Sequence, residues 1–187
     1  MTTMRDVINS LTHLGWSLKR DEVGDLYGIL QFRNRTLQII PTIQKRSDHY
    51  RVFWMPSVST ISFNNARGFI KGDDDKGHVP LIRKKEQVHI VNDLAEVNTE
   101  TVTQQLIEWA NEQDTVKQIE FLSSLSTDSK GTMPVYHLAA LALLGNIEKL
   151  EYYLASFHNG NRLGFVPYIK EDMLERAIQI AKENSQD

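Results

Sequence analysis

The first half of the chain alternates apolar and polar positions in short runs, a pattern that predicts β-strands. A helix comes first, because residues 4–14 space their apolar side chains three and four positions apart and Gly15 follows as a stop. The strand-like runs after it are "LYGILQF", "TLQIIPTI", "YRVFWM", "VSTISF" and "EQVHIVN". Alternation of this kind predicts an antiparallel sheet of about five strands with one face exposed to solvent.

One stretch between the last two strand-like runs looks irregular. Residues 64–85 read "NNARGFIKGDDDKGHVPLIRKK", and Gly68, Gly72, Gly77 and Pro80 interrupt them. Glycine and proline break regular structure, so we expect a long irregular connection here.

From residue 98 onward the glycines become rare and apolar side chains recur at helical spacing. Residues 98–125 predict either one long helix or two helices that break near Asp114. Three further helices are expected, around "VYHLAALALLG" after Pro134, around "NIEKLEYYLASF" after the capping Asn146, and around "EDMLERAIQIAKE".

This order of elements predicts the α+β class. We expect an N-terminal helix, the antiparallel sheet, and a C-terminal layer of about four helices. All of residues 1–187 are predicted to form a single domain, with helix and sheet in residues 1–97 and the helical layer in residues 98–187. No stretch near residue 97 is long or flexible enough to require a linker between domains.

The connection between the last two predicted helices is apolar for a loop. It reads "HNGNRLGFVPYIKEDML", residues 158–174, and holds Leu163 and Phe165 close together. We expect these side chains to fold inward and cover the end of the helical layer, because burial of apolar surface is favourable. The alternative is a partner-binding loop with Arg162 and Tyr168 as anchors, since these residue types are enriched at interface hot spots.

Residues 130–154 carry a second recognisable pattern. Gly131 and Pro134 precede a His-Leu-Ala-Ala stretch, and Gly145 and Asn146 precede the following helix. This pattern resembles an ankyrin unit, and the resemblance implies a helix-turn-helix. The chain holds no second copy, and a single unit cannot bury its faces by stacking on others.

Composition narrows the cellular setting. The 187 residues include no cysteine, which excludes disulfides and thiolate metal sites and favours a reducing compartment. No run approaches the roughly 18 apolar residues of a membrane span, and the N-terminal segment lacks the pattern of a signal peptide. We therefore expect a cytoplasmic protein without a membrane partner.

The net charge of −3 hides an asymmetry between the two halves. Residues 1–95 hold 14 Lys and Arg against 10 Asp and Glu, whereas residues 96–187 hold 7 against 14. The acidic second half bears on the choice of partner. The basic stretches "QKR" and "IRKKEQ" lack interleaved aromatic residues and read as solvated turns or strand ends, so we expect no nucleic-acid binding.

The sequence shows no local catalytic motif. The six histidines form no metal-binding pair at helical spacing, and neither a phosphate loop nor a G-x-S-x-G elbow occurs. Asp73, Asp74 and Asp75 with His78 are the one local group that could hold a metal, but adjacent aspartates point in different directions. We therefore expect no metal, no cofactor and no catalysis, with an enzyme of unrecognised type as the third hypothesis.

Two further resemblances concern larger parts of the chain. A helix followed by antiparallel strands and another helix is similar to the layout of type III secretion chaperones, which implies a dimeric binder of effector proteins. A compact, cysteine-free α+β chain without a catalytic motif resembles the immunity proteins of bacterial toxin–immunity pairs, including those of contact-dependent inhibition systems. This second resemblance implies that the chain neutralises a cognate toxin by covering its active site, and the chaperone-like binder is the alternative.

An acidic surface would fit a nuclease toxin, whose active cleft is basic. The contacts would then be acids on exposed helical faces or the aspartate triplet, together with the loop anchors. The candidate residues are Asp73, Asp74, Asp75, Glu108, Glu112, Asp114, Glu148, Glu151, Arg162 and Tyr168. The competing interpretation is that helices use glutamate for solubility and helix propensity alone.

Overall fold

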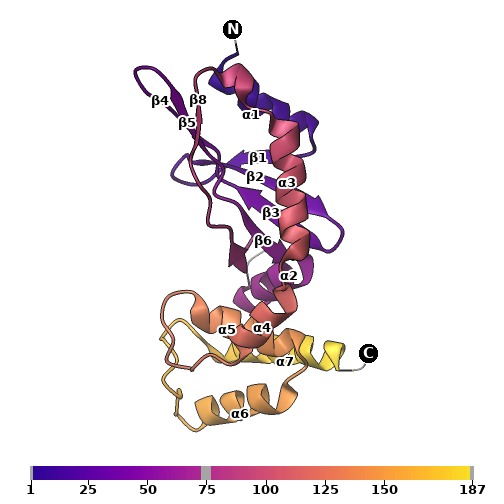
Figure 1. Ribbon diagram of the computed structural model, residues 1–187. Coiled ribbons are helices and arrows are strands. Elements are labelled where there is room, and N and C mark those ends of the chain that lie inside the picture. The colour runs from indigo at the N-terminus through magenta and orange to yellow at the C-terminus, as the bar shows by residue number, and fades with distance from the viewer. Residues whose placement is uncertain (1, 73–76, 186–187) are drawn as a thin grey trace. The chain divides into compact units, whose positions relative to one another are not determined.

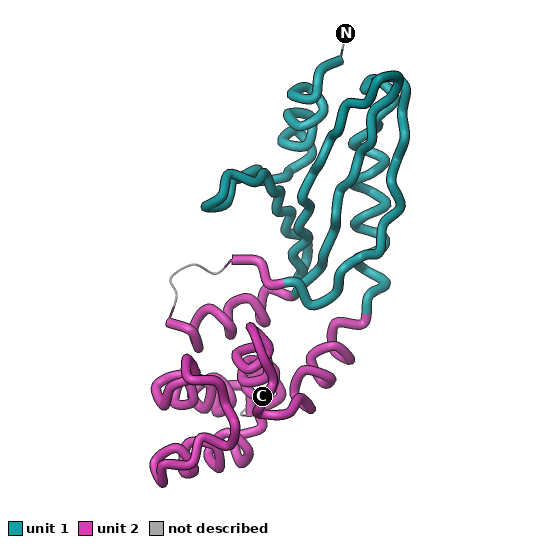
Figure 2. The backbone as a smooth tube through the Cα atoms, turned by 90° about the vertical axis from the view of Figure 1, so that its left-hand side faces the viewer, with its two compact units in different colours: residues 1–59, 80–113 teal, residues 60–79, 114–187 magenta. Residues whose placement is uncertain are grey.

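The chain forms two compact units, and each unit combines segments that are far apart in the sequence (Figures 1 and 2). Unit 1 contains residues 1–59 and 80–113, and unit 2 contains residues 60–79 and 114–187. The computed structural model describes residues 2–72 and 77–185. Helices and antiparallel sheets are both present, so the predicted α+β class is confirmed.

Two sheets account for the strands in the described part of the chain. The larger has the strand order β1-β2-β3-β6-β7, and the smaller has the order β4-β5-β8. The strands are β1 (Ser17–Arg20), β2 (Leu26–Phe32), β3 (Arg35–Ile39), β4 (Thr42–Lys45), β5 (Tyr50–Phe53), β6 (Ser57–Thr60), β7 (Ile82–Arg83) and β8 (His89–Val91). In the antiparallel β2–β3 hairpin, Leu30 lies opposite Leu37 and both are buried, so the apolar side of the alternation faces the core.

The predicted strand "TLQIIPTI" is divided between the two sheets. Its first part is β3, its second part is β4, and Pro41 lies between them. Proline has no N–H group to donate to a ladder, so the regular pairing of β3 ends before it. The neighbouring Ile40 amide donates instead to the Trp54 carbonyl oxygen at 2.7 Å.

Two helices and a short 3₁₀ helix belong to unit 1: α1 (Met4–His13), η1 (Leu94–Glu96) and α3 (Thr99–Glu112). Trp16 is buried, and its indole N–H donates to the Thr103 hydroxyl of α3 at 3.0 Å. Arg35 of β3 donates to the carbonyl oxygens of Ala110 and Gln113, at 2.5 and 3.0 Å. A cation at the carbonyl end of a helix is favourable for the helix dipole. These contacts hold one side of α3 against the rest of unit 1.

Helix α2 (Ile61–Lys71) covers the last three residues of the predicted strand "VSTISF" and the first part of the stretch predicted as an irregular connection. The Thr60 hydroxyl caps it by accepting from the Phe63 amide at 3.1 Å, and Gly72 ends it in the left-handed conformation, with φ of 76°. Gly68 is buried within the helix and does not break it. The prediction was wrong here because a glycine inside a helix weakens it by only about 1 kcal/mol, which packing offsets.

Unit 2 combines α2 with α4 (Thr115–Ser123), α5 (Met133–Leu143), α6 (Ile147–His158) and α7 (Glu171–Asn184). Asp114 caps α4 by accepting from the Lys117 amide at 2.9 Å, so the alternative of two helices that break near Asp114 is confirmed. The helix-turn-helix implied by the ankyrin resemblance is present as α5 and α6, with Gly145 at φ of 65° between them.

Helix α5 is the centre of unit 2. Most of its residues are buried, and it packs against α2, α4, α6 and α7. The Phe63 ring of α2 meets the Tyr136 ring of α5 edge to face, with 5.8 Å between the centroids. In the described residues, no helix combines the length and apolar character that a membrane span requires.

Candidate protein-binding surfaces

The loop between α6 and α7 inserts the Phe165 side chain into the core of unit 2, and we call this side chain the plug. Phe165 is 4% exposed, and its ring lies edge to face against Tyr153 and Phe157, with centroid distances of 5.2 and 5.8 Å. Ile169 is fully buried, whereas Leu163 is half-buried. The prediction that apolar residues of this loop fold inward is therefore confirmed, most clearly for Phe165.

Arg162, one of the two predicted anchors, holds the loop together. Its guanidinium group lies over the Phe157 ring, 4.8 Å from the centroid. Its Nη2 group donates to the carbonyl oxygens of Val166 and Ile169, at 3.1 and 2.6 Å. These contacts give Arg162 a structural role, and its role in binding a partner stays a prediction.

Tyr168, the other predicted anchor, is tied to the loop that precedes α5. Its hydroxyl donates to the Gly131 carbonyl oxygen at 2.7 Å, and burial raises the pKa of this hydroxyl. The side chain nevertheless remains 44% exposed. An aromatic side chain held in this way can contact a partner at a low cost in conformational entropy.

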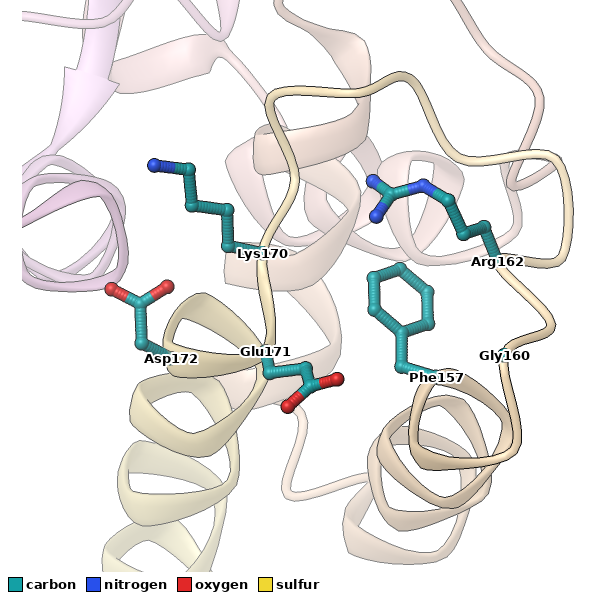
Figure 3. Close-up of a pocket in the computed structure, with 6 residues that line it drawn as sticks. All are labelled: Phe157, Gly160, Arg162, Lys170, Glu171 and Asp172. Atoms are coloured by element: carbon teal, nitrogen blue, oxygen red, sulfur yellow. The ribbon is translucent and has the colours of Figure 1, made fainter.

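An open pocket of about 550 Å³ lies beside this loop (Figure 3). It is lined by Phe157, Gly160, Arg162, Lys170, Glu171 and Asp172. In Figure 3 the Arg162 guanidinium lies above the Phe157 ring, whereas the Lys170 and Asp172 side chains point away from these two side chains. On the side of Arg162 and Phe157, the pocket is therefore an aromatic and guanidinium surface with the Glu171 carboxylate beside it.

The carboxylates of this pocket already have basic side chains as neighbours. Asp172 pairs with Arg176 one helical turn further along α7, at 2.9 Å. Glu171 lies 3.6 Å from the imidazole of His158. Charges of both signs thus meet around the pocket, and they favour neither a cationic nor an anionic ligand.

Below the plug lies a buried polar pair. His137 is fully buried, its Nδ1 lies 2.9 Å from the Leu122 carbonyl oxygen, and its Nε2 lies 3.1 Å from the Tyr153 hydroxyl. A carbonyl oxygen only accepts, so Nδ1 carries the proton and Nε2 accepts from the tyrosine. Burial lowers the pKa of His137 and raises the pKa of Tyr153 to about 12. The pair is neutral and joins α4, α5 and α6.

The outer face of α3 in unit 1 carries a line of three acids and one glutamine. Glu100, Gln104, Glu108 and Glu112 follow one another at intervals of four residues, and all four are exposed. At a rise of 1.5 Å per residue the line is about 18 Å long. The helix holds no lysine or arginine. We call this line the acidic ridge; it includes the predicted contacts Glu108 and Glu112.

Beside the start of this ridge, unit 1 has a groove of about 540 Å³. One wall is α1, and the other is formed by η1 and the first residues of α3. Its apolar lining residues are Val7, Leu14, Leu94, Ala95 and Val97. Asp6 and Glu100 line it as well, and so does His13. We call it the α1 groove.

The α1 groove was not found from the sequence. It joins residues 2–14 to residues 94–100, and nothing in a single sequence shows that these segments meet. The acidic ridge could have been found, because the spacing of Glu100, Glu108 and Glu112 is visible in the sequence. Glu100 was missed as a member of it.

The remaining predicted contacts have separate outcomes. Asp73, Asp74 and Asp75 lie outside the described residues. Asp114 is occupied as the cap of α4. Glu148 and Glu151 are exposed neighbours on α6, where Glu151 lies 3.5 Å from the Lys182 ammonium of α7. Their role in binding stays a prediction.

Among residues 2–72 and 77–185, no three histidine, aspartate or glutamate side chains are grouped so as to hold a metal ion.

Comparison with protein families gave one match, described as a family of unknown function (DUF6990), over residues 3–182. Comparison with curated proteins and with solved structures gave no match.

Proposed function

This chain belongs to the DUF6990 family of unknown function, and we propose that it is a protein-binding module, most concretely an immunity protein that neutralises a bacterial toxin. The observation that carries the proposal is the acidic ridge on α3. Three carboxylates stand along an exposed helix face that holds no basic residue. Such a face is complementary to the basic cleft of an enzyme that acts on nucleic acid.

The proposed mechanism is occlusion. The ridge attracts a basic active cleft over distances comparable to the Debye length, about 8 Å at physiological ionic strength, and thereby speeds the encounter. Once bound, the ridge takes the place of the substrate phosphates along the cleft. The chain contributes no catalysis in this mechanism, and it acts in the cytoplasm, where the toxin arrives or is made.

The fixed position of α3 supports this role. Arg35 holds its carbonyl end and Trp16 binds Thr103 in its middle, so the ridge is presented on a rigid element. A rigid binding face loses little conformational entropy when it docks.

The direct test is co-expression of this chain with the product of the adjacent open reading frame in the native host. We expect that polypeptide to arrest growth when expressed alone, and this chain to restore growth and to purify with it as a one-to-one complex. Capture of a secreted effector that stays unfolded would support the chaperone-like alternative and contradict the immunity proposal. Absence of any complex at micromolar concentrations would contradict both.

The ridge itself is tested with two matched variants of the full chain. Glu100→Gln, Glu108→Gln and Glu112→Gln together remove the ridge charges. Three exposed acids on other helices serve as a control that removes the same net charge: Glu120→Gln, Glu175→Gln and Glu183→Gln. We expect the ridge variant to bind the toxin roughly tenfold more slowly at low salt, with the difference shrinking as salt is added. Equal rates for the two variants would exclude the ridge as the docking face.

A further inference from the structure

We propose that the α1 groove of unit 1 receives a lysine or arginine side chain of the protein partner. This inference deepens the proposed function and rests on it for the identity of the partner as a basic protein. The recognition chemistry itself belongs to the groove. It combines an apolar floor with carboxylates at its rim, which is the environment that a long cationic side chain requires.

The floor of the groove fits the aliphatic part of such a side chain. Val7 and Leu94 are buried at its base, and Leu14 and Val97 are half-buried beside them. Lysine and arginine place their methylene stems against apolar surface while the charged group stays in water. The volume of about 540 Å³ lies within the range of roughly 300–1,000 Å³ that is typical of ligand sites.

Two carboxylates at the rim of the groove, those of Asp6 and Glu100, supply negative charge for the cationic end of such a side chain. Hydrogen bonds from the Thr3 hydroxyl and amide to Asp6 Oδ2, at 2.7 and 2.8 Å, lower the pKa of Asp6, so this carboxylate stays charged. Glu100 lies on the opposite wall, and its carboxylate has neither a hydrogen bond nor an ion pair within the described part of the chain. The described residues that line the groove include no lysine or arginine.

The two walls are joined before any partner binds. The hydroxyl groups of Ser10 on α1 and Thr99 on α3 lie 2.8 Å apart and share a hydrogen bond. The Asn98 side chain caps α3 by accepting from the Thr101 amide at 2.9 Å. A preformed groove needs little reorganisation, which favours specific docking of one side chain over loose attraction to an acidic surface.

The groove also continues the acidic ridge. Glu100 belongs to both, so a basic side chain in the groove would place neighbouring basic residues of the same partner along α3. Glu108 follows Glu100 by two intervals of the ridge, about 12 Å at the helical rise of 1.5 Å per residue. The partner is therefore expected to present cationic side chains at about this separation.

The groove can be tested without the partner. The probes are N-acetyl-arginine amide and N-acetyl-lysine amide, titrated into the full chain while backbone amide shifts are recorded by nuclear magnetic resonance. N-acetyl-norleucine amide, which has an apolar side chain of similar length and no charge, is the control. We expect saturable shifts at millimolar probe, confined to residues 5–14 and 93–101, with both cationic probes and not with norleucine. Shifts that spread along the ridge without saturating, or that norleucine reproduces, would overturn the proposal.

Two variants of the full chain separate the rim from the floor. Glu100→Gln is expected to weaken the arginine probe about threefold, in line with one exposed charge pair. Ala95→Phe places a large side chain in the groove at an exposed position and is expected to abolish the saturable shifts. Glu120→Gln, an exposed acid on α4 outside the ridge and the groove, is the matched control and should bind the probe as the unmodified chain does. Loss with Glu120→Gln equal to that with Glu100→Gln would refute a role for the groove.

The two proposals fail separately. Neutralisation of a toxin without saturable binding of the cationic probes overturns the groove and leaves the proposed function. Saturable binding in the groove without any toxin partner supports the groove chemistry and overturns the immunity function.

Discussion

At the scale of single residues, His137 shows how unit 2 accommodates a polar group in its apolar centre. Both ring nitrogens have partners, the Leu122 carbonyl oxygen and the Tyr153 hydroxyl, and the ring is fully buried. A satisfied polar group costs little, whereas the same group without one partner costs about 1–3 kcal/mol. The sequence assigned this histidine no metal or catalytic role, and the structure gives it a structural one.

The burial of His137 predicts how stability depends on pH. In the unfolded chain this histidine takes up a proton near its ordinary pKa of 6.5, and in the folded chain it does so only at lower pH, because burial lowers the pKa of His137. Its contribution to stability is therefore complete above about pH 6.5 and declines as the pH falls below it, at up to about 1.4 kcal/mol per pH unit. Urea unfolding between pH 5 and 7.5 measures this slope.

The matched comparison is His137→Gln, which keeps a polar side chain but cannot titrate. We expect the variant to be less stable at pH 7.5 and to show a flatter slope below pH 6.5, since the other five histidines are common to both proteins. Parallel slopes for the two proteins would mean that His137 takes up its proton equally in the folded and unfolded states.

At the scale of elements, the loop between α6 and α7 is fixed by a side chain from within it. Phe165 packs against Tyr153 and Phe157, so Phe165→Ala should lower the free energy of unfolding by about 3–5 kcal/mol. Val166→Ala, at the half-buried neighbour, is the control and should cost less than about 1.5 kcal/mol. Chemical denaturation measures both, and similar losses for the two variants would contradict the plug.

Much of this element could be predicted because its signal is local. The apolar cluster in "NRLGFVPYI" predicted burial, a break between two helices was one expectation near Asp114, and Asn146 marked a helix start through its capping chemistry. Helix α2 could not be found in this way, because Gly68 and Gly72 look alike in sequence while only Gly72 ends the helix. What distinguishes them is tertiary packing, since the α2 face that holds Phe63 lies on α5.

At the scale of the whole molecule, both units are discontinuous. The predicted layers divide at residue 97, but α3 packs with α1 and β3 in unit 1, and α2 packs with α5 in unit 2. A contact such as Ser10 with Thr99 spans 89 residues and leaves no trace in local periodicity. For the same reason the α1 groove was not predicted, whereas the acidic ridge, which lies within one helix, was found in part.

The discontinuity of unit 2 predicts the behaviour of a fragment. Residues 114–187 retain α4 to α7 but lack α2, so the side of α5 that contacts Phe63 becomes exposed. We expect this fragment to keep helical far-ultraviolet circular dichroism, to bind an apolar dye such as ANS, and to lose a cooperative thermal transition. A synthetic peptide of residues 57–72 added in trans should reduce the dye binding. A fragment that unfolds cooperatively without the peptide would show that α2 is dispensable.

The inserted position of α2 also has a consequence for synthesis on the ribosome. Helix α2 ends at Lys71, and its partner α5 is complete only at Leu143, roughly 70 residues later. At elongation rates of about 5–20 residues per second, α2 waits for roughly 4–14 s with its apolar face uncovered. During that interval Phe63 and Ile70, which are buried in the folded protein, stay uncovered on the nascent chain and form a segment that a chaperone would recognise. Early folding of this protein is therefore expected to depend on protection of α2 until α5 is complete.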